Sequence, residues 1–456
     1  MKKFFGNKAF YFTTLSIALP IMAQQFVTSF VNLIDNIMIG SVGSLALTSV
    51  TVANRVYLIF NSTMFGICGA AGIFIAQYYG AKNYTKCQKI LNINLTCGLL
   101  VACLFMSALI IMPKQLMEIF SANPEVIDES LRYIQFAVLT YIPYAFSFSI
   151  MMALRAVGIN KIQLGVGMLT VATNTTLNYI LIFGNFGFPA LGVQGAAIAT
   201  AIARFLEMFI YLIILMRKKH FFTFSLRELY HLDFSLIRSM IRKAIPLTAN
   251  EIFFSLGLAM IFLSYMRCDE SLISAISVVD TVMQIAYIVF GGLSSAISIL
   301  IGNRLGANQI AEAKSNAYKL LAFGVMIGLT ISVIFVSVAP LIASFYNVED
   351  IIKETIVILL RIKSLLLPIY VYNVCIFFTL RAGGDTFSTM LMDSGFLWCA
   401  GVLLSTILSV FTGIPLIGLF AIVESCDLIK LFVATYFFKK GRWAKNMTLT
   451  QDTVYS

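Results

Sequence analysis

The chain has 456 residues, of which 59% are hydrophobic and only 12% are charged. Soluble globular proteins carry about 25% charged residues, so a chain with half that content must place most of its length in lipid. This composition excludes a soluble enzyme, a disordered protein and a nucleic-acid-binding domain. The net charge of +11 would suggest nucleic acid in a soluble protein, but in a membrane protein it indicates basic cytoplasmic loops.

Twelve apolar stretches are long enough to cross a bilayer, which takes about 20 residues for a helix. Helices are expected because lipid leaves backbone amides no other partner except a closed barrel, and these runs are too long and too continuous for barrel strands. We therefore predict an all-α membrane protein. The predicted spans cover residues 12–38, 45–76, 90–112, 131–153, 162–183, 193–216, 238–265, 270–301, 318–345, 356–379, 388–411 and 416–438.

The loops between these spans differ in charge. Most of the 32 Lys and Arg residues fall in the two termini and in alternate loops, above all in a basic link at 217–240. Two of the opposite loops carry acids instead, around Glu125 and around Glu349. We expect a multi-pass protein of the cell (plasma) membrane. By the positive-inside rule, both of its termini and the basic link should lie in the cytoplasm.

The chain aligns with itself without gaps when Pro20 is set against Pro246. The matched residues are mostly Gly and Pro, which make kinks, turns and close helix contacts. Each half holds six predicted spans, so both halves insert the same way up, related by an axis along the membrane normal. We predict an N-lobe (1–216) and a C-lobe (241–456) around a central cleft. Further matches at the same offset include Gly66 with Gly292, Arg155 with Arg381, and Pro189 with Pro415.

Four polar residues of the first half have no counterpart of the same chemistry in the second. Asp35 lies in the first predicted span, Asn174 and Asn178 share one helix face in the fifth, and Thr200 lies in the sixth. Counting residues places Asp35, Asn178 and Thr200 roughly 8–12 Å from the same membrane face. The residues aligned with them are Ile261, Ala400, Leu404 and Cys426.

Ionisable residues inside a membrane are costly, so by default they mark function. The oxygens of Asp35, Asn174, Asn178 and Thr200 suit a small cation such as Na⁺. The carboxylate alone also suits a proton, because burial disfavours its charged form. The alternative is that these side chains only join helices, as Asn and Thr do routinely.

The second half has acids of its own within its predicted spans. Glu251, aligned with Gln25, and Asp280 lie near mid-membrane, and we interpret them as parts of a substrate site. The alternative is that each pairs with a base. Gln25 and Asn32 of the first span are further substrate candidates. Two pairs with a spacing of three residues are interpreted as structural ion pairs: Arg204–Glu207 and Asp427–Lys430.

The sequence lacks the motifs for ATP hydrolysis, metal binding and nucleophilic catalysis. The chain has no GxxxxGK[ST] segment, so we expect no ATP hydrolysis by the chain itself. Its two histidines, His220 and His231, fall in the basic link, and its eight cysteines show no metal-ligand spacing. An intramembrane enzyme is the alternative of a different class, but the repeat and the lack of a nucleophile–base pair argue against it. We expect no cofactor, no nucleic-acid partner and a monomer.

Segments along essentially the whole chain resemble the multidrug and toxic compound extrusion (MATE) transporters. Singly each is weak, but in this order and on these spans they are specific. They are Ala18-Leu19-Pro20, Asn32 through Gly40, Ala76 through Ala81, Leu154-Arg155-Ala156, Asn178 through Gly184, and Gly192 through Thr200.

The resemblance implies two six-helix lobes with a V-shaped cleft, and export of cationic, amphipathic drugs in exchange for H⁺ or Na⁺. It implies that Asp35 is the coupling acid and that Asn174, Asn178 and Thr200 help to bind the cation. Many relatives have Asp at the position of Asn178, so this chain carries one charge fewer there.

The resemblance extends to the second half. Glu251 matches an acid that some relatives use, whereas an acid of their tenth span is replaced near Tyr370, which we count among the substrate candidates. A second transporter reading is a flippase for a lipid-linked precursor, which related folds perform. A wide basic cleft would favour the flippase, and Glu251 and Asp280 disfavour it.

Overall fold

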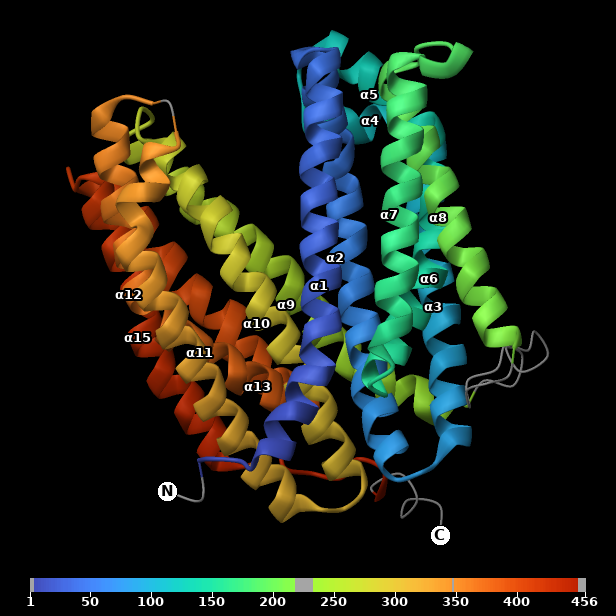
Figure 1. The fold of residues 1–456 in the computed structure, drawn as a ribbon, viewed down its shortest axis with the longest axis vertical. Coiled ribbons are helices and arrows are strands. Elements are labelled where there is room, and N and C mark those ends of the chain that lie inside the picture. The colour runs from blue at the N-terminus through green and yellow to red at the C-terminus, as the bar shows by residue number, and fades with distance from the viewer. Residues whose placement is uncertain (1–3, 218–232, 347, 450–456) are drawn as a thin grey trace. The chain divides into compact units, whose positions relative to one another are not determined.

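The computed structural model describes residues 4–217, 233–346 and 348–449, and all its regular elements there are helical (Figure 1). Ten of the predicted spans are single helices, and the fourth and eleventh are composite. The single helices are α1 (Lys8–Val42), α2 (Ser44–Gly80), α3 (Tyr84–Ile111), α7 (Asn160–Phe183), α8 (Gly192–Met216), α9 (Phe234–Cys268), α10 (Ile273–Gly306), α11 (Ile310–Ser344), α12 (Asp350–Ala382) and α15 (Leu416–Lys440).

The fourth span consists of α5 (Pro124–Ala137), a 3₁₀ turn and α6 (Tyr141–Ala156), and it follows the short α4 (Pro113–Glu118). The eleventh consists of α13 (Thr386–Met390), two π-helical segments and α14 (Leu403–Phe411). The π-helical segments cover Leu391–Gly395 and Leu397–Val402. A π-helix is rare and often marks a functional place in a helix.

Eleven helical stretches of the described residues are long and apolar enough to cross a membrane. The helix α15 is 25 residues long, as long as α8, but it is not among the eleven. It carries Glu424, Asp427 and Lys430 near its middle, which lowers its apolar content. The criterion of length and apolar composition therefore misses this span because of the three ionisable side chains near its middle.

The predicted basic link lies mostly outside the described residues. Positions 218–232, with both histidines, are not described, and the last residues of the predicted link already belong to α9. Asp233 caps the start of this helix: its Oδ1 accepts hydrogen bonds from the backbone N–H groups of Ser235 (3.0 Å) and Leu236 (3.3 Å). A hydrogen bond from the Ser235 hydroxyl lowers the pKa of Asp233.

Contacts divide the chain into two compact units. The N-unit is Ala23–Thr248, and the C-unit comprises the residues through Met22 together with those from Ala249 onward. Met22 ends the first segment of the C-unit, and Thr248 ends the N-unit. These two residues are aligned with each other in the sequence repeat. The start of α1 thus belongs to the C-unit and the start of α9 to the N-unit, which differs from the predicted lobes. Both boundaries follow a helix proline, Pro20 in α1 and Pro246 in α9, where one backbone hydrogen bond is lost.

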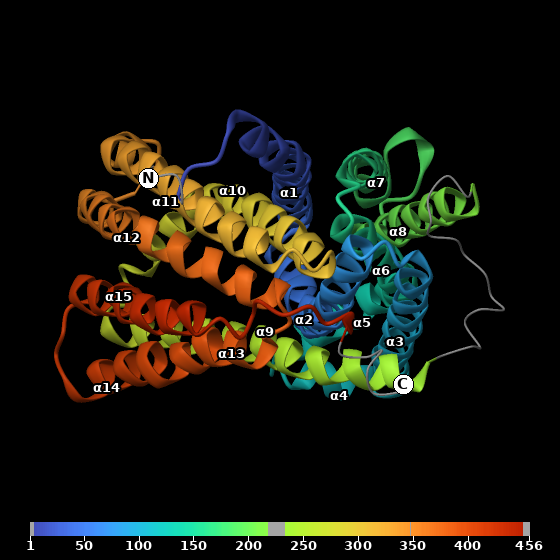
Figure 2. The same ribbon diagram turned by 90° about the horizontal axis from the view of Figure 1, so that it is seen from below.

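Within the C-unit, α12 packs against α10, α11 and α15 (Figures 1 and 2). Within the N-unit, α7 packs against α8, and α2 packs against α3. A core of buried apolar side chains fills each unit, including Val279, Leu359 and Phe420 in the C-unit. In this way α12 brings its side chains next to those of α10 and α15.

Two glycines of the repeat stand at equivalent helix crossings. A Cβ on Gly66 would lie 2.5 Å from Cα and 2.7 Å from N of Thr248. Gly292 is aligned with Gly66, and a Cβ there would lie 2.9 Å from the carbonyl oxygen of Ala18 and would also meet Met22. Since Met22 is itself aligned with Thr248, the repeat encodes one close crossing inside each unit.

The crossing at Gly66 predicts an unusual cost for a small substitution. Gly66→Ala should lower the free energy of unfolding by about 1–3 kcal/mol, because the added methyl meets backbone atoms that cannot swing aside. Gly165→Ala is the matched control: Gly165 is also helical, has nothing within 4 Å of its Cβ position, and should gain up to about 1 kcal/mol from helix propensity. Thermal unfolding in detergent measures both. Equal midpoints for the two variants would contradict the close crossing.

Candidate functional site

Asp35, Asn178, Asn174 and Thr200 form a continuous chain of hydrogen bonds in the N-unit. The Asn178 amide nitrogen donates to Asp35 Oδ1 (2.8 Å) and to Asn174 Oδ1 (3.4 Å). The Asn174 amide nitrogen donates in turn to Thr200 Oγ1 (3.2 Å). The structure thus brings together residues of α1, α7 and α8 that lie far apart in the sequence.

Local helix geometry explains this arrangement. Asn174 and Asn178 are one turn apart on α7, so their side chains lie one above the other. The Thr200 hydroxyl donates to the carbonyl oxygen of Ala196 (2.9 Å), which leaves its lone pairs for Asn174. Both Asn side chains are buried, while Asp35 and Thr200 are partly exposed.

The cluster contains more acceptors than donors. Asn178 Oδ1 is buried and has no hydrogen-bond partner. Among the described residues, no Lys or Arg forms an ion pair with Asp35. A buried acceptor without a donor costs about 1–3 kcal/mol. A cation or a proton bound beside Asp35 would supply the missing positive charge.

An apolar layer lies one helical turn away from three of the four polar residues. Ile39 follows Asp35 on α1, Ile182 follows Asn178 on α7, and Ala196 precedes Thr200 on α8. These apolar residues belong to one buried cluster with Val50 and Val193. A low-dielectric layer of this kind strengthens the interaction of Asp35 with any bound cation.

A second polar group of the N-unit is satisfied internally. Arg204 forms the ion pair with Glu207 that the sequence predicts, at 2.8 Å. The Arg204 guanidinium also lies 4.9 Å from the centre of the Tyr144 ring, and the Tyr144 hydroxyl donates to Asn61. Because Arg204 neutralises Glu207, this group resembles a structural ion pair rather than a binding site for a mobile cation.

The two acids assigned to a substrate site each have a base partner in the C-unit. Glu251 lies 3.2 Å from Arg381, and Asp280 lies 2.9 Å from Lys363. Lys363 is also 3.3 Å from Glu424. Both acids therefore pair with bases, as the alternative states, and their part in a substrate site stays a prediction.

The predicted ion pair between Asp427 and Lys430 is wrong. Lys430 Nζ lies instead 2.7 Å from Asp393 Oδ1, in the first π-helical segment. Asp393 also accepts a hydrogen bond from Asn250 (3.1 Å), whose own amide oxygen accepts from the backbone N–H of Ser394 (3.2 Å). The spacing of three residues was misleading because Lys430 reaches across to another span.

Acids outnumber bases in this part of the C-unit. Three bases, Lys363, Arg381 and Lys430, hold four acids through ion pairs. Among the side chains that the structure describes, Asp427 takes part in no ion pair. The surplus of carboxylates favours positively charged ligands. The five acids are Glu251, Asp280, Asp393, Glu424 and Asp427.

Of the remaining candidates, Tyr370 borders the acidic cluster of the C-unit, whereas Gln25 and Asn32 belong to neither cluster. Tyr370 packs against Tyr287, with ring centres 5.3 Å apart. Gln25 is partly exposed and Asn32 is exposed, and neither forms a side-chain hydrogen bond within the described part of the chain. Sequence reasoning missed Lys363, although a lysine inside the predicted span 356–379 was a direct indication.

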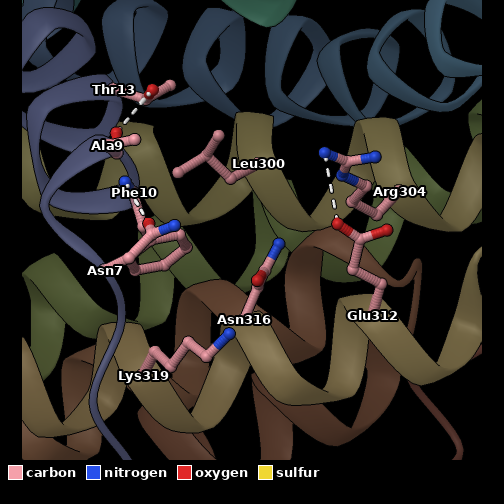
Figure 3. A pocket seen from close by; sticks show the side chains of 9 residues that line it. All are labelled: Asn7, Ala9, Phe10, Thr13, Leu300, Arg304, Glu312, Asn316 and Lys319. Carbon is pink, nitrogen blue, oxygen red and sulfur yellow. Dashed lines mark hydrogen bonds and ion pairs between the residues drawn. The ribbon is translucent and has the colours of Figure 1, made fainter.

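A pocket of about 480 Å³ lies in the C-unit where the start of α1 faces α10 and α11 (Figure 3). Two bases and one acid line it: Arg304 pairs with Glu312 at 3.3 Å, and the Lys319 ammonium lies 5.5 Å from the Phe10 ring centre. With more bases than acids, this pocket does not suit a cation, and it shares no residue with the carboxylate clusters.

The family model described as MatE matches residues 20–180 and 246–394, more than half of the chain. The chain belongs to the MATE family. The two matches begin at Pro20 and at Pro246, which are aligned with each other, so the family model finds the same repeat. The resemblance that the sequence motifs indicate is confirmed, and the chain is a member of a non-enzymatic family of multidrug efflux transporters.

Two curated relatives match this chain over nearly its full length. A NorM protein of Thermotoga maritima, described as a probable multidrug resistance protein, is 24% identical over 453 residues, 96% of this chain and 94% of the relative. The uncharacterized transporter YisQ of Bacillus subtilis is 23% identical over 416 residues, 90% of each chain.

The solved structures bear on the fold alone. A mutant of the Vibrio cholerae MATE transporter VcmN matches with a TM-score of 0.87 at 17% identity, covering 96% of this chain and 98% of that one. A MOP superfamily transporter from Pyrococcus furiosus matches with a TM-score of 0.85 at 15% identity, over 95% and 96%. The prediction of an all-α, multi-pass membrane protein is confirmed.

The Glu251–Arg381 pair predicts a strong dependence of each partner on the other. Arg381→Met should lower the free energy of unfolding by about 3–5 kcal/mol, because it leaves Glu251 charged and unpaired in a buried site. The double variant Glu251→Gln with Arg381→Met should recover most of this loss. Thermal unfolding of the purified variants tests the pair; a double variant as unstable as Arg381→Met would count against it.

Proposed function

We propose that the chain is a secondary active exporter that moves cationic, amphipathic organic compounds, including drugs, in exchange for H⁺ or Na⁺. One observation carries this proposal. Asp35 accepts a hydrogen bond from Asn178 at 2.8 Å, and none of the described Lys or Arg side chains pairs with it. An acid in such a place gains from binding a mobile cation.

The proposed mechanism works through the charge of Asp35. The cation or proton enters the N-unit cluster from outside and neutralises the carboxylate. The outward state then loses affinity for the positively charged drug, which leaves. Coupling requires that ion and drug favour different conformations, since a ligand shifts an equilibrium only by its difference in affinity for the two states. The surplus of acids in the C-unit supports a positively charged substrate.

We place the chain in the plasma membrane as a monomer with both termini in the cytoplasm, on the basis of the charge distribution of its loops. The flippase reading receives no support from the carboxylate-rich part of the C-unit. A lipid-linked phosphate would need a basic surface, whereas the ionisable cluster around Lys363 and Lys430 carries more acids than bases.

Replacing Asp35 tests the coupling role directly. In proteoliposomes, Asp35→Asn should reduce gradient-driven drug accumulation to the level of empty liposomes, because no neutralisable charge is left. Asp233→Asn is the matched control, since Asn also caps a helix start, and it should transport like the unmodified protein. Retained gradient-driven transport by Asp35→Asn would refute the proposed role of this carboxylate.

The amide residues distinguish the two coupling ions. Na⁺ needs several oxygen ligands, whereas a proton needs only the carboxylate. We therefore expect Asn178→Leu to abolish transport driven by a Na⁺ gradient and to retain transport driven by a pH gradient. Both gradients are imposed separately on the same proteoliposomes. Loss of both kinds of transport would show that Asn178 positions Asp35 rather than binding the ion.

A further inference from the structure

Lys363 occupies the space between two carboxylates inside the C-unit. Its ammonium lies 2.9 Å from Asp280 Oδ1 and 3.3 Å from Glu424 Oε1. The three side chains come from α12, α10 and α15, and we call them the Lys363 triad. The lysine and Glu424 are only 14% and 20% exposed, while Asp280 is 54% exposed. Asp280 is therefore the carboxylate of the triad that a ligand reaches first.

Aromatic rings border the triad. The Lys363 ammonium lies 5.6 Å from the centre of the Phe420 ring. Tyr287 is close enough to Lys363 to interact with it electrostatically, and Tyr370 packs on Tyr287. Ring faces attract cations, so the surroundings of the triad suit an organic cation as well as the lysine.

The triad does not belong to the architecture that the two halves share. In the alignment of the halves, Asp280, Lys363 and Glu424 stand against Asn54, Ala137 and Ile198. No charge is present at any of the three positions in the first half. Stability also gives no reason for it, because replacing a buried ion pair by apolar residues of similar volume is often neutral or stabilising. Charges retained inside a membrane protein point to a role in its activity.

The charge count of the triad is one positive against two negative. We propose that Lys363 sets the charge of the substrate: it cancels one carboxylate, so the triad accepts an organic cation with a single charge and discriminates against one with two. This inference rests on the proposed function, export of organic cations. The entering cation pairs with Asp280, and the lysine ammonium is then held by Glu424 alone. Lys363 is thus a specificity-determining residue.

Ethidium and propidium test this assignment, because they share one fluorescent ring system and carry one and two positive charges. The purified full-length protein is titrated with each dye at equilibrium, without an ion gradient. Lys363→Met leaves two uncompensated carboxylates. Its ratio of propidium to ethidium affinity should rise about tenfold or more over the unmodified protein, which corresponds to about 1.4 kcal/mol. Lys363→Arg keeps the charge and should keep the ratio.

Two further variants keep the test decisive if Lys363→Met folds poorly. The double variant Lys363→Met with Glu424→Gln again has one net negative charge and should show the unmodified ratio. Asp280→Asn leaves the triad neutral and should weaken ethidium binding. Lys353→Met is the matched control on the same helix: Lys353 pairs with the exposed Asp350 at 3.4 Å, and its loss should change neither dye.

The outcomes separate this inference from the proposed function. An unchanged affinity ratio in folded Lys363→Met, or an equal rise in Lys353→Met, overturns the role of Lys363 and leaves export of cations standing. A protein that binds neither dye overturns both. Failure of the Asp35 coupling test does not affect the ratio, since the titration uses no gradient.

Discussion

The structure depends on one constraint: an ionised side chain in a lipid-spanning helix must be paired or must be used. The C-unit mostly pairs its charges, with Arg381 on Glu251, Lys430 on Asp393 and Lys363 between two acids. The N-unit instead surrounds Asp35 with amides and a hydroxyl, which stabilise a carboxylate but do not neutralise it. A hydrogen bond from a neutral amide leaves the negative charge in place, so Asp35 still needs a cation.

The internal repeat separates architecture from activity. Positions that the halves share serve backbone geometry: Pro20 and Pro246 lie just before the unit boundaries, and Gly66 and Gly292 permit equivalent close crossings. The capping residues Asn7 and Asp233 are also aligned with each other, and each accepts backbone hydrogen bonds at a helix start. Duplication thus preserved kinks, crossings and caps. The acids of the spans diverged, which is expected if two similar lobes took on different tasks.

Much of the site follows from the sequence because it is set by local periodicity. Asn174 and Asn178 must share a face of one helix, and depth along a span follows from the rise per residue, so the approach of Asp35 and Thr200 needed only the order of the spans. Pairing in the C-unit depends on how each helix is rotated about its axis, and apolar sequences fix rotation poorly. For that reason Lys430 was assigned to Asp427 instead of Asp393. The first segment of α1 belongs to the C-unit and that of α9 to the N-unit. The sequence could not predict this assignment, since an alignment of the halves does not show which unit a segment contacts.

The two clusters differ in what a mobile cation gains from them. At Asp35 an arriving ion meets a carboxylate with no competing base among the described side chains, so it gains the full interaction in a low-dielectric site. At Asp280 the place is already taken by the Lys363 ammonium at 2.9 Å, and a small inorganic ion would have to displace a covalently attached charge of equal size. In the proposed mode of binding, an organic cation would gain an additional contribution there, because its apolar surface would pack on the neighbouring rings. In the proposed mechanism, the presence of Lys363 beside Asp280 and the absence of such a base beside Asp35 would therefore favour the inorganic ion in the first half and the organic cation in the second.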